Sequence, residues 1–551
     1  MAFYGGHDSA FCIYSKEQDK FFTIELEKLL GIKHFSWPGN YQSMKMSKIF
    51  QGNQRAVLEQ LKEEVIKLGL KPEFRHVVIG STWGAIHQQR PYLLPMEMLS
   101  EYFYIENYSI NRGHHLGHAW SAIMQLPPER GLFITCDGGG DDAYFTFGEF
   151  DRSTNLFKRH VNSQDNRHKI GGIYEGLGHQ HLDSICQSSP SGLDIAGKIM
   201  GAAGYGKPVE LTPKSWYEDS EHKKTHPESY VAYSFYGENN RFRFINKNHM
   251  TFQEECDACH TIQLQIEQLF DDTIHELIPD FEEKLEHYGR NIIFSGGFAL
   301  NIINNMKLEE KYNCKIWVPC NPGDNGLPFG FLTKWLIENE KFSMSKRLYD
   351  NSFTGPPVRD LDRLLSYRKH FYPKAEKITA QEIARILKKG EVIALMHGNL
   401  ETGFRALGNR SILCDASIEG IKDKVNLTKR RELYRPFAPI CRWEDASKWF
   451  EVDDVNNYKH MNIAVKVRED ANLPSITHID GTARLQAIDE PGFMDDLLKI
   501  HGGVLLNTSM NLSGKPICNS LFEAFHILER TPLDKLIVVD GDDIWCFNET
   551  I

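Results

Sequence analysis

The chain has 551 residues, and at roughly 100–200 residues per domain this length predicts two to four domains. Hydrophobic residues make up 41% and charged residues 25% of the sequence, values that are typical of soluble globular proteins and exclude a disordered, collagen-like or low-complexity chain. The formal net charge of −11 argues against a surface that binds nucleic acid throughout, because such a surface is basic. A local basic site for phosphate remains compatible with this charge.

Targeting and cysteine patterns predict a cytoplasmic protein without a membrane span. No apolar run approaches the roughly 18–20 residues that cross a bilayer, and the N-terminal residues lack the basic and apolar stretches of a signal peptide. The 11 cysteines are irregularly spaced, as in proteins of a reducing compartment. Cys256, Cys259 and His260 have the spacing of a haem attachment site, but that chemistry requires export. The helical spacing from Cys259 to Leu277 favours a helix with incidental cysteines.

Three predicted strands end in glycines. Glycine tolerates positive φ and lets the backbone approach a ligand closely. One such turn would be ordinary, but three together suggest a phosphate-holding cleft between two related halves. The strands with their glycines are 2–4 with Gly5 and Gly6, 131–136 with Gly138, Gly139 and Gly140, and 291–294 with Gly296 and Gly297. Further strands are expected at 11–14 and 143–147, and a hairpin turn at 151–155.

Helices are expected between these strands, at 53–68 and 263–287. Alternating strands and helices predict an α/β fold. The pattern lapses at 340–375, which contains a Gly-Pro-Pro turn and a polar, basic stretch, and we place a domain junction there. A second α/β unit follows, with a helix at 380–389 and strands at 391–396, 503–506 and 536–539.

His114 and His118 are candidate metal ligands. Residues four apart share one face of a helix, and two imidazoles placed in this way can chelate one divalent ion. A solvated or hydrogen-bonded histidine pair is the alternative. The other ligands must come from distant segments, and Asp137 and Asp324 in glycine-rich loops are suitable carboxylates. Such a set would suit iron, manganese or zinc.

Two further segments are candidates for the same cleft. His7 follows the first glycine pair and could act as a general base toward a hydroxyl group. The alternative is a turn in which Asp8 and Ser9 satisfy backbone amides. The stretch 192–207, which contains Lys198, is rich in glycine and lysine but matches neither a Walker A motif nor GxGxxG. It permits close approach to a nucleotide, or it forms a flexible surface loop.

Arginine is concentrated in the second unit. Arg405 and Arg410 flank Ala-Leu-Gly, and further cations follow up to Arg435 and again at Arg484. Arginine binds phosphate through two parallel hydrogen bonds, so this density predicts a site for a compact polyanion such as a triphosphate. For Lys422 and Lys424 in the basic stretch 421–435, a solvated helix face is the alternative.

Ten motifs in order show that the whole chain resembles the O-carbamoyltransferases of the NodU/cephalosporin carbamoyltransferase family, which includes tobramycin carbamoyltransferase. The motifs are HDSA at 7–10, HHLGHAWSA at 114–122, CDGGGD at 136–141, GKIMGAAGYG at 197–206, SGGFALN at 295–301, NPGDNG at 321–326, RALGNRS at 405–411, RPFAP at 435–439, THIDGTAR at 477–484 and LLNTSMN at 505–511.

The resemblance implies two domains. Residues 1–350 are expected to form a duplicated actin-like ATPase (ASKHA, actin/Hsp70-like) domain for carbamoyl transfer, 351–374 a linker, and 375–551 a YrdC-like domain. In such a protein the C-terminal domain condenses carbamoyl phosphate with ATP, and carbamoyl-adenylate passes to the N-terminal domain. The implied cofactors are ATP, carbamoyl phosphate, Fe²⁺ or another divalent metal, and Mg²⁺.

The resemblance also assigns roles by position. The metal ligands would be His114, His118, Asp137 and Asp324; the catalytic residues His7, Asp8 and Arg484; and the residues that bind nucleotide or carbamoyl phosphate Lys198, Gly296, Gly297, Asn301, Arg405, Arg410, Lys429, Arg430, Arg435, Asn507 and Ser509. The chain departs from the family pattern at Gly5–Gly6, Trp120, Phe404 and Met510, which affects the acceptor pocket and local packing more than the reaction.

The acceptor hydroxyl is left open by the sequence. A sugar, a natural-product alcohol or a hydroxymethylated pyrimidine, free or in DNA, are the expected partners; nucleic acid is expected only as acceptor, and a homodimer is left open. Acceptor residues are expected in 30–50, 80–105 and 160–190. Aromatic side chains there could stack on a ring or belong to the core, namely Phe35, Trp37, Tyr41, Trp83 and Tyr92. The alternatives to this function are a tRNA threonylcarbamoylation-type enzyme and a non-catalytic nucleotide-binding protein of the actin/Hsp70 class.

Overall fold

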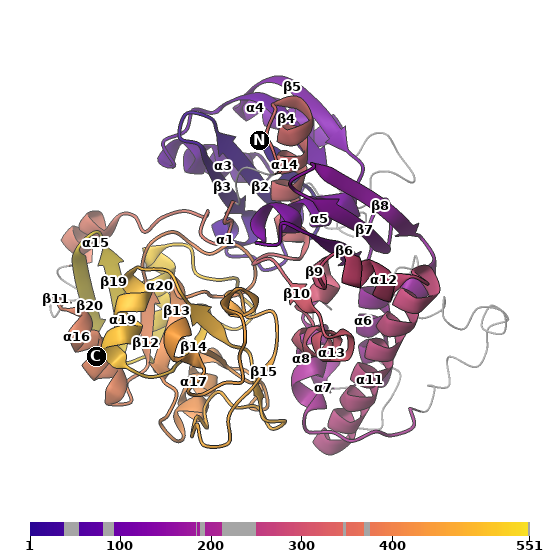
Figure 1. Ribbon diagram of the computed structural model, residues 1–551. Helices are drawn as coiled ribbons and strands as arrows, with labels where there is room; N and C mark the ends of the chain where they lie inside the picture. Colours follow the sequence, from indigo (N-terminus) through magenta and orange to yellow (C-terminus); the bar gives the residue numbers. More distant parts are fainter. Residues whose placement is uncertain are drawn as a thin grey trace.

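The protein is a mixed α/β structure with several sheets (Figure 1). The computed structural model describes residues 1–37, 54–80, 93–182, 184–187, 193–211, 250–344, 349–368 and 375–548. In Figure 1 the first sheet lies at the top, the second to its right, and the C-terminal sheet at the lower left. No helix among the described residues is long and apolar enough to span a bilayer.

The first sheet has five strands in the order β3-β2-β1-β4-β5. The strands are β1 (Ala2–Tyr4), β2 (Ala10–Ser15), β3 (Lys20–Glu25), β4 (Glu73–Gly80) and β5 (Tyr104–Asn111). Neighbours β1, β2 and β3 are antiparallel, whereas β4 pairs in parallel with β1 and β5. The helices α1 (Leu26–Leu30), α3 (Gln54–Lys67) and α4 (Leu93–Tyr102) contribute to the core of this part.

The second sheet repeats this topology. Its order is β10-β9-β6-β7-β8, with β6, β7 and β8 antiparallel and β9 parallel to both β6 and β10. The strands are β6 (Arg130–Cys136), β7 (Phe145–Asp151), β8 (Leu156–Ser163), β9 (Asn291–Ser295) and β10 (Lys315–Trp317). The two sheets therefore share one strand order and one pattern of directions, which matches the two related halves expected from the glycine pairs.

Several helices accompany the second sheet. They are η1 (Asn166–His168), α6 (Ile170–His181), α7 (Ser184–Gln187), α8 (Ile195–Ala203), α11 (Phe252–Leu277), α12 (Phe281–His287), η3 (Gly297–Leu300) and α13 (Ile302–Tyr312). The expected helix 263–287 is interrupted at Pro279, because proline lacks the N–H that a continuing helix needs. Cys256 and Cys259 are buried within α11, as the helix interpretation of this segment expects.

Two glycines bring α5 (His114–Gln125) against α14 (Leu327–Asn339), which follows η4 (Asp324–Gly326). A Cβ atom on Gly330 would lie 1.9 Å from the carbonyl oxygen of Gly117, and one on Gly117 would lie 2.3 Å from the ring of Phe331. Any larger residue would separate the helices. Both helices belong to the apolar cluster that joins the first two sheets. Since His114 begins α5 and Asp324 lies just before α14, this contact fixes both residues.

The C-terminal sheet has eight strands in the order β11-β20-β19-β12-β13-β18-β14-β17. These are β11 (Glu376–Lys377), β12 (Ile393–Met396), β13 (Arg410–Asp415), β14 (Ala438–Arg442), β17 (Gln486–Ile488), β18 (Leu505–Ser509), β19 (Lys535–Asp540) and β20 (Asp543–Asn548); β15 (Val465–Lys466) and β16 (Thr482–Ala483) form a separate pair. Its helices are α16 (Ala380–Lys388), α17 (Ile421–Lys429), α18 (Trp443–Ala446), η5 (Val455–Tyr458), α19 (Phe493–His501) and α20 (Leu521–Arg530).

The segment expected as a linker, 351–374, is packed where the structure describes it. Asn351 is fully buried, and its side chain accepts a hydrogen bond from Thr23 of the first sheet at 3.1 Å. The short helix α15 (Leu361–Arg368) follows. Residues 369–374 lie outside the described residues. The described part of this segment therefore connects the N-terminal half of the chain, with its two related sheets, to the C-terminal half through buried contacts.

Candidate active sites

The N-terminus of α5 presents two histidines from a fixed position. The backbone N–H groups of His114 and His115 donate to the carboxylates of Asp141 and Asp142, each at 2.9 Å. Both aspartates lie in the loop that begins with Asp137. This one loop therefore caps the helix and also supplies a carboxylate to its histidines. Burial raises the pKa of Asp141 to about 6. Neither Asp141 nor Asp142 has a role predicted from the sequence.

Asp137 and Asp324 meet these histidines in a buried cluster. The Nε2 atom of His118 lies 2.8 Å from Asp137 and 3.5 Å from Asp324, and that of His114 lies 3.5 Å and 3.3 Å from the same carboxylates. The two Nε2 atoms are 3.1 Å apart. The structure thus brings together the four residues that the sequence pattern selected.

This donor set fits a divalent ion. Ligands at about 2.1 Å from one ion lie about 3.0–3.4 Å from one another, and the observed distances of 2.8–3.5 Å are close to this range. Burial lowers the pKa of His114, but the charges of Asp324 and Asp137 outweigh it and raise that pKa well above its usual value. The cluster therefore attracts positive charge, and neutral imidazoles with two carboxylates are ligands for iron, manganese or zinc.

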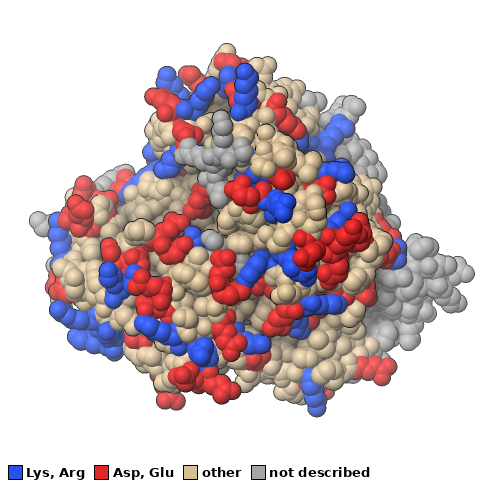
Figure 2. Space-filling model, viewed as in Figure 1, with Lys and Arg blue, Asp and Glu red and all other residues tan. Residues whose placement is uncertain are grey.

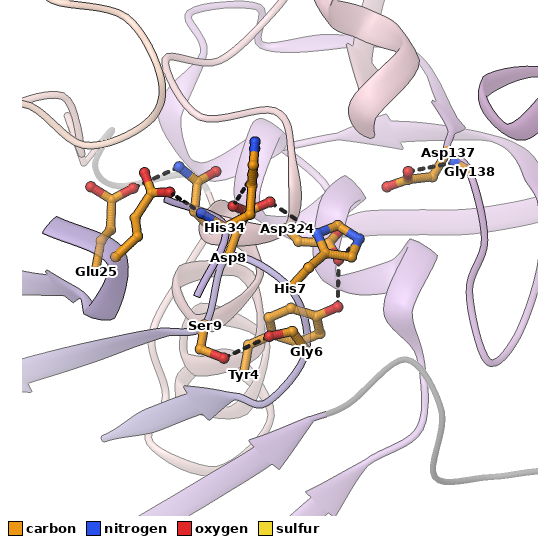
Figure 3. A network of polar contacts seen from close by, with 12 residues as sticks. Tyr4, Gly6, His7, Asp8, Ser9, Glu25, His34, Asp137, Gly138 and Asp324 are labelled. Atoms are coloured by element: carbon orange, nitrogen blue, oxygen red, sulfur yellow. Dashed lines mark hydrogen bonds and ion pairs between the residues drawn. The ribbon is translucent and has the colours of Figure 1, made fainter. Parts of the chain in front are cut away.

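His7 and Asp8 lie at the edge of the metal-ligand cluster (Figure 3). His7 Nε2 is 3.2 Å from Asp324, and His7 Nδ1 is 2.9 Å from Asp8. The other oxygen of Asp8 is 2.8 Å from His34 Nδ1, so one carboxylate orients two imidazoles. Burial lowers the pKa of His7, but the charges of Asp324 and Asp8 outweigh this and raise it to about 10.

In the turn at Asp8, Ser9 satisfies backbone groups as the alternative interpretation expects, whereas the Asp8 carboxylate contacts the side chains of His7 and His34. Ser9 Oγ donates to Gly6 O at 2.7 Å and accepts from the Trp37 backbone N–H at 2.8 Å. A Cβ on Gly6 would lie 2.3 Å from the hydroxyl oxygen of Tyr4, whose hydroxyl donates to Asp324 in a short hydrogen bond. The glycine at this departure from the family pattern therefore leaves room for a tyrosine that contacts a candidate metal ligand.

The third glycine pair packs against the metal-ligand loop. Gly296 has φ +96°, and a Cβ there would lie 2.2 Å from the carbonyl oxygen of Cys136. A Cβ on Gly297 would lie 3.1 Å from Asp137 Oδ1. Asn301 caps α13 by accepting from the Asn304 backbone N–H at 3.1 Å. These contacts show a role in shaping the cluster, and contact of these residues with an adenylate stays a prediction.

Two residues without any motif lie near the metal-ligand cluster. Glu175 on α6 is half-buried and has no hydrogen-bond or ion-pair partner among the described residues. Burial raises its pKa to about 7, opposed by the charge of His7. Burial lowers the pKa of Lys169 to about 8. The Gly171–Gly172 pair could have indicated this segment, since a Cβ on Gly171 would lie 2.9 Å from the Gly138 nitrogen.

The aromatic candidates for an acceptor pocket have different outcomes. Phe35 and Trp37 are buried in the core of the first sheet, with only 7% and 2% of their surface exposed. Both therefore have the core role that was the alternative. Tyr41, Trp83 and Tyr92 lie outside the described residues. At another departure from the family pattern, Trp120 stacks on Phe157 with ring centroids 4.6 Å apart.

The C-terminal half contains a cluster of arginines, Arg405, Arg431, Arg435 and Arg484. The pKa of Arg484 is held well below its usual value by burial and by the charges of the other three. The Nε atoms of Arg405, Arg431 and Arg484 are buried without a hydrogen-bond acceptor. Glu432 lies 3.5 Å from Arg435 and offsets part of the positive charge. In a chain with a net charge of −11, the positive charge that remains is suited to binding a polyanion.

Lys429 extends this site toward β18. Its Nζ is 3.2 Å from the hydroxyl of Ser509 and also donates to the side chain of Asn511. Burial and the nearby charges of Arg431 and Arg435 hold its pKa well below the usual value. Asn507 on the same strand donates to the carbonyl of Ala406 at 2.9 Å, which connects β18 to the loop of Arg405.

Arg410 and Arg430 lie apart from the arginine cluster. The Arg410 guanidinium is fully buried and donates to backbone carbonyls, including those of Asn409 at 3.0 Å and Gly398 at 3.2 Å. Its observed role is to hold loops together. Arg430 is exposed at the end of α17, where it adopts φ +47°. The chain turns there, and Arg431, which the assignment by position omitted, lies in the cluster instead.

Lys198 lies between the N-terminal and C-terminal halves of the chain. Its Nζ is 2.7 Å from Glu432 beside the arginine cluster. Residues Ile195–Ala203 of the glycine-rich stretch around it form the helix α8, so the surface-loop alternative is wrong for this part of the stretch. A Cβ on Gly204 would lie 2.3 Å from the ring of His478, and His478 Nε2 is 3.0 Å from Gly201 O. Where the structure describes them, these glycines permit close approach between the halves, and nucleotide binding here stays a prediction.

Charge on the surface is mixed. Figure 2 shows Lys and Arg interspersed with Asp and Glu over the described part of this face. Lys424 is one example, since it pairs with Asp534 on the partly exposed side of α17. Its role matches the solvated-helix alternative for this lysine.

Comparisons with known proteins identify the family. The model named carbamoyltransferase N-terminus matches residues 96–331, which include all four residues of the metal-ligand cluster. The model named carbamoyltransferase C-terminus matches residues 384–541, which include the arginine cluster. The chain belongs to the carbamoyltransferase family. This carbamoyltransferase is accordingly a transferase enzyme.

Relatives span most of the chain. Nodulation protein NolO of Bradyrhizobium diazoefficiens is 30% identical over 77% of this chain and 77% of its own length. An uncharacterised protein of Methanocaldococcus jannaschii is 30% identical over 77% of this chain and 72% of its own length. The 3'-hydroxymethylcephem-O-carbamoyltransferase of Streptomyces clavuligerus is 36% identical over 29% of this chain and 31% of its own length.

Solved structures give weaker likenesses to this carbamoyltransferase. A full-length HypF in a phosphate- and nucleotide-bound form is 17% identical over 30% of this chain and 24% of its own, with a TM-score of 0.23. An N-acetylglucosamine kinase candidate from Porphyromonas gingivalis is 16% identical over 62% of this chain and 99% of its own, with a TM-score of 0.30. TM-scores this low do not establish a shared fold.

Proposed function

We propose that this chain is an ATP-dependent O-carbamoyltransferase with two sites. The observation that carries the proposal is the arginine cluster, whose members repel one another and leave three buried Nε atoms without acceptors. Such a site is complete only with a polyanion, and a triphosphate with carbamoyl phosphate supplies one. The second site is the metal-ligand cluster with His7 beside it.

The reaction at the arginine cluster activates a carbamoyl group. Carbamoyl phosphate is hydrolysed to carbamate and phosphate, and the carbamate oxygen then attacks the α-phosphorus of ATP. Carbamoyl-adenylate forms and pyrophosphate leaves. Arg405, Arg484 and Lys429 neutralise the negative charge that develops on the phosphates. Adenylation replaces an anion that resists attack with a good leaving group.

Transfer occurs at the metal-ligand cluster, where an acceptor hydroxyl attacks the carbamoyl carbon and AMP leaves. A divalent ion held by His114, His118, Asp137 and Asp324, iron being our proposal, would supply Lewis acidity there. His7 accepts the hydroxyl proton, and Asp8 holds its ring with Nε2 toward the site. The negative charges of Asp324 and Asp8 keep His7 protonated. His7 can therefore act as a base only when a cation in the cluster balances these charges.

The fold supports a passage between the sites. The residues after α1 lie near both of them, and His34 is the one that contacts Asp8. The charge of Lys33 is among those that lower the pKa of Lys429. A short, enclosed path would limit hydrolysis of the adenylate. The repeated sheet topology of 1–350 supports a duplicated actin-like domain, and we assign 375–551 to a YrdC-like activation domain.

The test is pyrophosphate release from MgATP with and without carbamoyl phosphate, with mass spectrometry of candidate acceptors. The panel contains sugars, natural-product alcohols, and hydroxymethylated pyrimidines both free and in DNA. Pyrophosphate release that depends on carbamoyl phosphate, with a carbamoyl mass gain on one acceptor, is the expected result. Release that depends instead on threonine and tRNA, or ATP binding without any release by folded and iron-loaded protein, would contradict the proposal.

A further inference from the structure

Glu25 and Lys28 form a buried ion pair at the start of α1. Their side chains are 3% and 1% exposed, and Lys28 Nζ contacts Glu25 Oε2 in a short ion pair. Burying two charges is costly unless each also makes further hydrogen bonds. Here both do, and the partners come from the loop that leads to the arginine cluster.

Both members of the pair hold loop 401–405. Lys28 Nζ donates to the carbonyl oxygens of Glu401 at 2.7 Å and Gly403 at 2.8 Å. The Gly403 N–H donates to Glu25 Oε1 at 3.0 Å. The pair therefore binds the donor and the acceptor of one peptide segment, which fixes the orientation of its backbone. Arg405 lies two residues further along this loop.

The same Glu25 oxygen also holds the metal-ligand loop. Asn325 Nδ2 donates to Glu25 Oε1 at 2.6 Å, and Asn325 directly follows the metal-ligand candidate Asp324. Glu25 is one of the residues drawn in Figure 3, in the same polar network as Asp324. One carboxylate oxygen thus bonds both to the residue after Asp324 and to the backbone near Arg405.

The two loops are in direct contact at this point. Gly403 has φ +87°, and a Cβ there would lie 2.7 Å from the carbonyl oxygen of Cys320. A Cβ on Gly323 would lie 3.2 Å from the ring of Phe404. The spacing of the loops therefore depends on small residues and on the bonds to the ion pair.

We propose that the Glu25–Lys28 pair is a positioning unit that holds the activation loop against the metal-ligand loop, so that carbamoyl-adenylate passes between the two sites without release to solvent. The inference rests on the proposed function. Neither residue touches a reacting atom in this scheme. Both act through Gly403 and Asn325, and loss of the pair loosens the loops while each site keeps its own ligands.

The experiment measures how much carbamoyl-adenylate escapes for each pyrophosphate formed. The enzyme turns over with MgATP and carbamoyl phosphate, and rapid ultrafiltration collects the filtrate into hydroxylamine, which converts escaped carbamoyl-adenylate to hydroxyurea. Reactions without ATP give the background from carbamoyl phosphate. The double variant Glu25→Leu/Lys28→Met removes both charges together, since a lone buried charge threatens folding. A milder double variant, Glu25→Gln/Lys28→Met, keeps an oxygen acceptor at position 25 and leaves no lone charge.

We expect the double variant to raise the ratio of escaped adenylate to pyrophosphate roughly tenfold, a common size for coupling between two sites. Glu25→Gln/Lys28→Met should raise it less, and both variants should retain pyrophosphate release. The control is Glu310→Gln/Lys466→Met, which removes an exposed ion pair of 3.4 Å between the same two halves. It should leave the ratio unchanged.

The outcomes separate the inference from the function on which it rests. An unchanged ratio in the double variant, or an equal rise in the control, would overturn the positioning role. A purely structural role would lower pyrophosphate release and escape together and leave the ratio constant. If the wild-type enzyme forms no pyrophosphate from ATP and carbamoyl phosphate, the proposed function itself fails, before any variant is compared.

Discussion

The Nε2 atom of His118 lies 2.8 Å from Oδ2 of Asp137. The two residues come from different elements, since His118 is on α5 and Asp137 follows β6. They meet because Asp141, later in the Asp137 loop, caps the N-terminus of α5 through the His114 backbone N–H. The loop that supplies the carboxylate thus also positions the helix that supplies the imidazoles.

We expect His114→Ala and His118→Ala to lose the divalent ion and carbamoyl transfer while retaining pyrophosphate release. Each variant removes one of four ligands from a buried cluster, but the arginine cluster lies in the other half of the chain. Metal content by atomic spectrometry and the two activities measured separately test this. His275→Ala, which changes a half-exposed histidine on α11, is the control. Retained metal and transfer in His118→Ala would refute the assignment.

Arg484→Met should abolish pyrophosphate release without lowering thermal stability. The guanidinium has no ion-pair partner among the described residues, and three neighbouring arginines repel it. Its removal relieves that repulsion but weakens charge neutralisation, for which a loss of about 100-fold or more in rate is expected. The control is Arg430→Met, which changes an exposed arginine outside the cluster. Normal pyrophosphate release by Arg484→Met would exclude Arg484 from activation.

Arg410→Met should behave in the opposite way, with a loss of stability. The wild-type guanidinium donates to the carbonyl oxygens of His397, Gly398 and Asn409 in the loops around β13, and a methionine cannot replace these hydrogen bonds. At about 1.5–3 kcal/mol for each hydrogen bond to a charged group, the free energy of unfolding should fall by at least about 2 kcal/mol. Urea denaturation measures it. Full stability with selective loss of pyrophosphate release would instead show that Arg410 binds phosphate.

The contrast among these arginines shows where sequence patterns stop being informative. The strands that end in glycine and the helix face shared by His114 and His118 follow from local backbone periodicity. Both could therefore be predicted from the sequence. Whether an arginine points into a site depends on long-range packing. Arg430 and Arg431 are neighbours of the same type, and only the left-handed turn at Arg430 determines which one lies in the cluster.

The same limit applies to residues outside any motif. Glu25, Lys28 and Glu175 have no characteristic spacing, and their positions follow from how α1 and α6 pack against loops far away in the sequence. The resemblance to a family supplied motif positions only. It therefore located the four residues of the metal-ligand cluster but could not indicate the ion pair that bridges the two loops.

Glu175→Gln should change how stability depends on pH. Burial raises the pKa of Glu175 from 4.5 to about 7, so the folded protein binds this proton more tightly than the unfolded chain does. The stability from that proton is complete below about pH 4.5 and is lost as the pH rises through about 7. At about 1.4 kcal/mol per pH unit, the wild type should lose up to about 3 kcal/mol relative to the variant.

Urea denaturation with a chelator, at about pH 4.5 to about pH 8, tests this difference. The control is Glu283→Gln, which changes an exposed carboxylate on α12 and should track the wild type at each pH. Parallel stability curves for the wild type and Glu175→Gln would show that Glu175 is not held in an environment that favours its proton.

Gly296→Ala should damage the metal-ligand cluster through its backbone. At φ +96° an alanine is strained, and its Cβ would lie 2.2 Å from the carbonyl oxygen of Cys136, which precedes Asp137. The matched control is Gly481→Ala, which has φ +77° but open space around the new Cβ. Both variants carry the strain of positive φ, so their difference isolates the clash. We expect Gly296→Ala to lose at least about 2 kcal/mol more stability than the control and to bind the metal more weakly. Equal stability and equal metal affinity in the two variants would mean that β6 and β9 can separate at this point without moving Asp137.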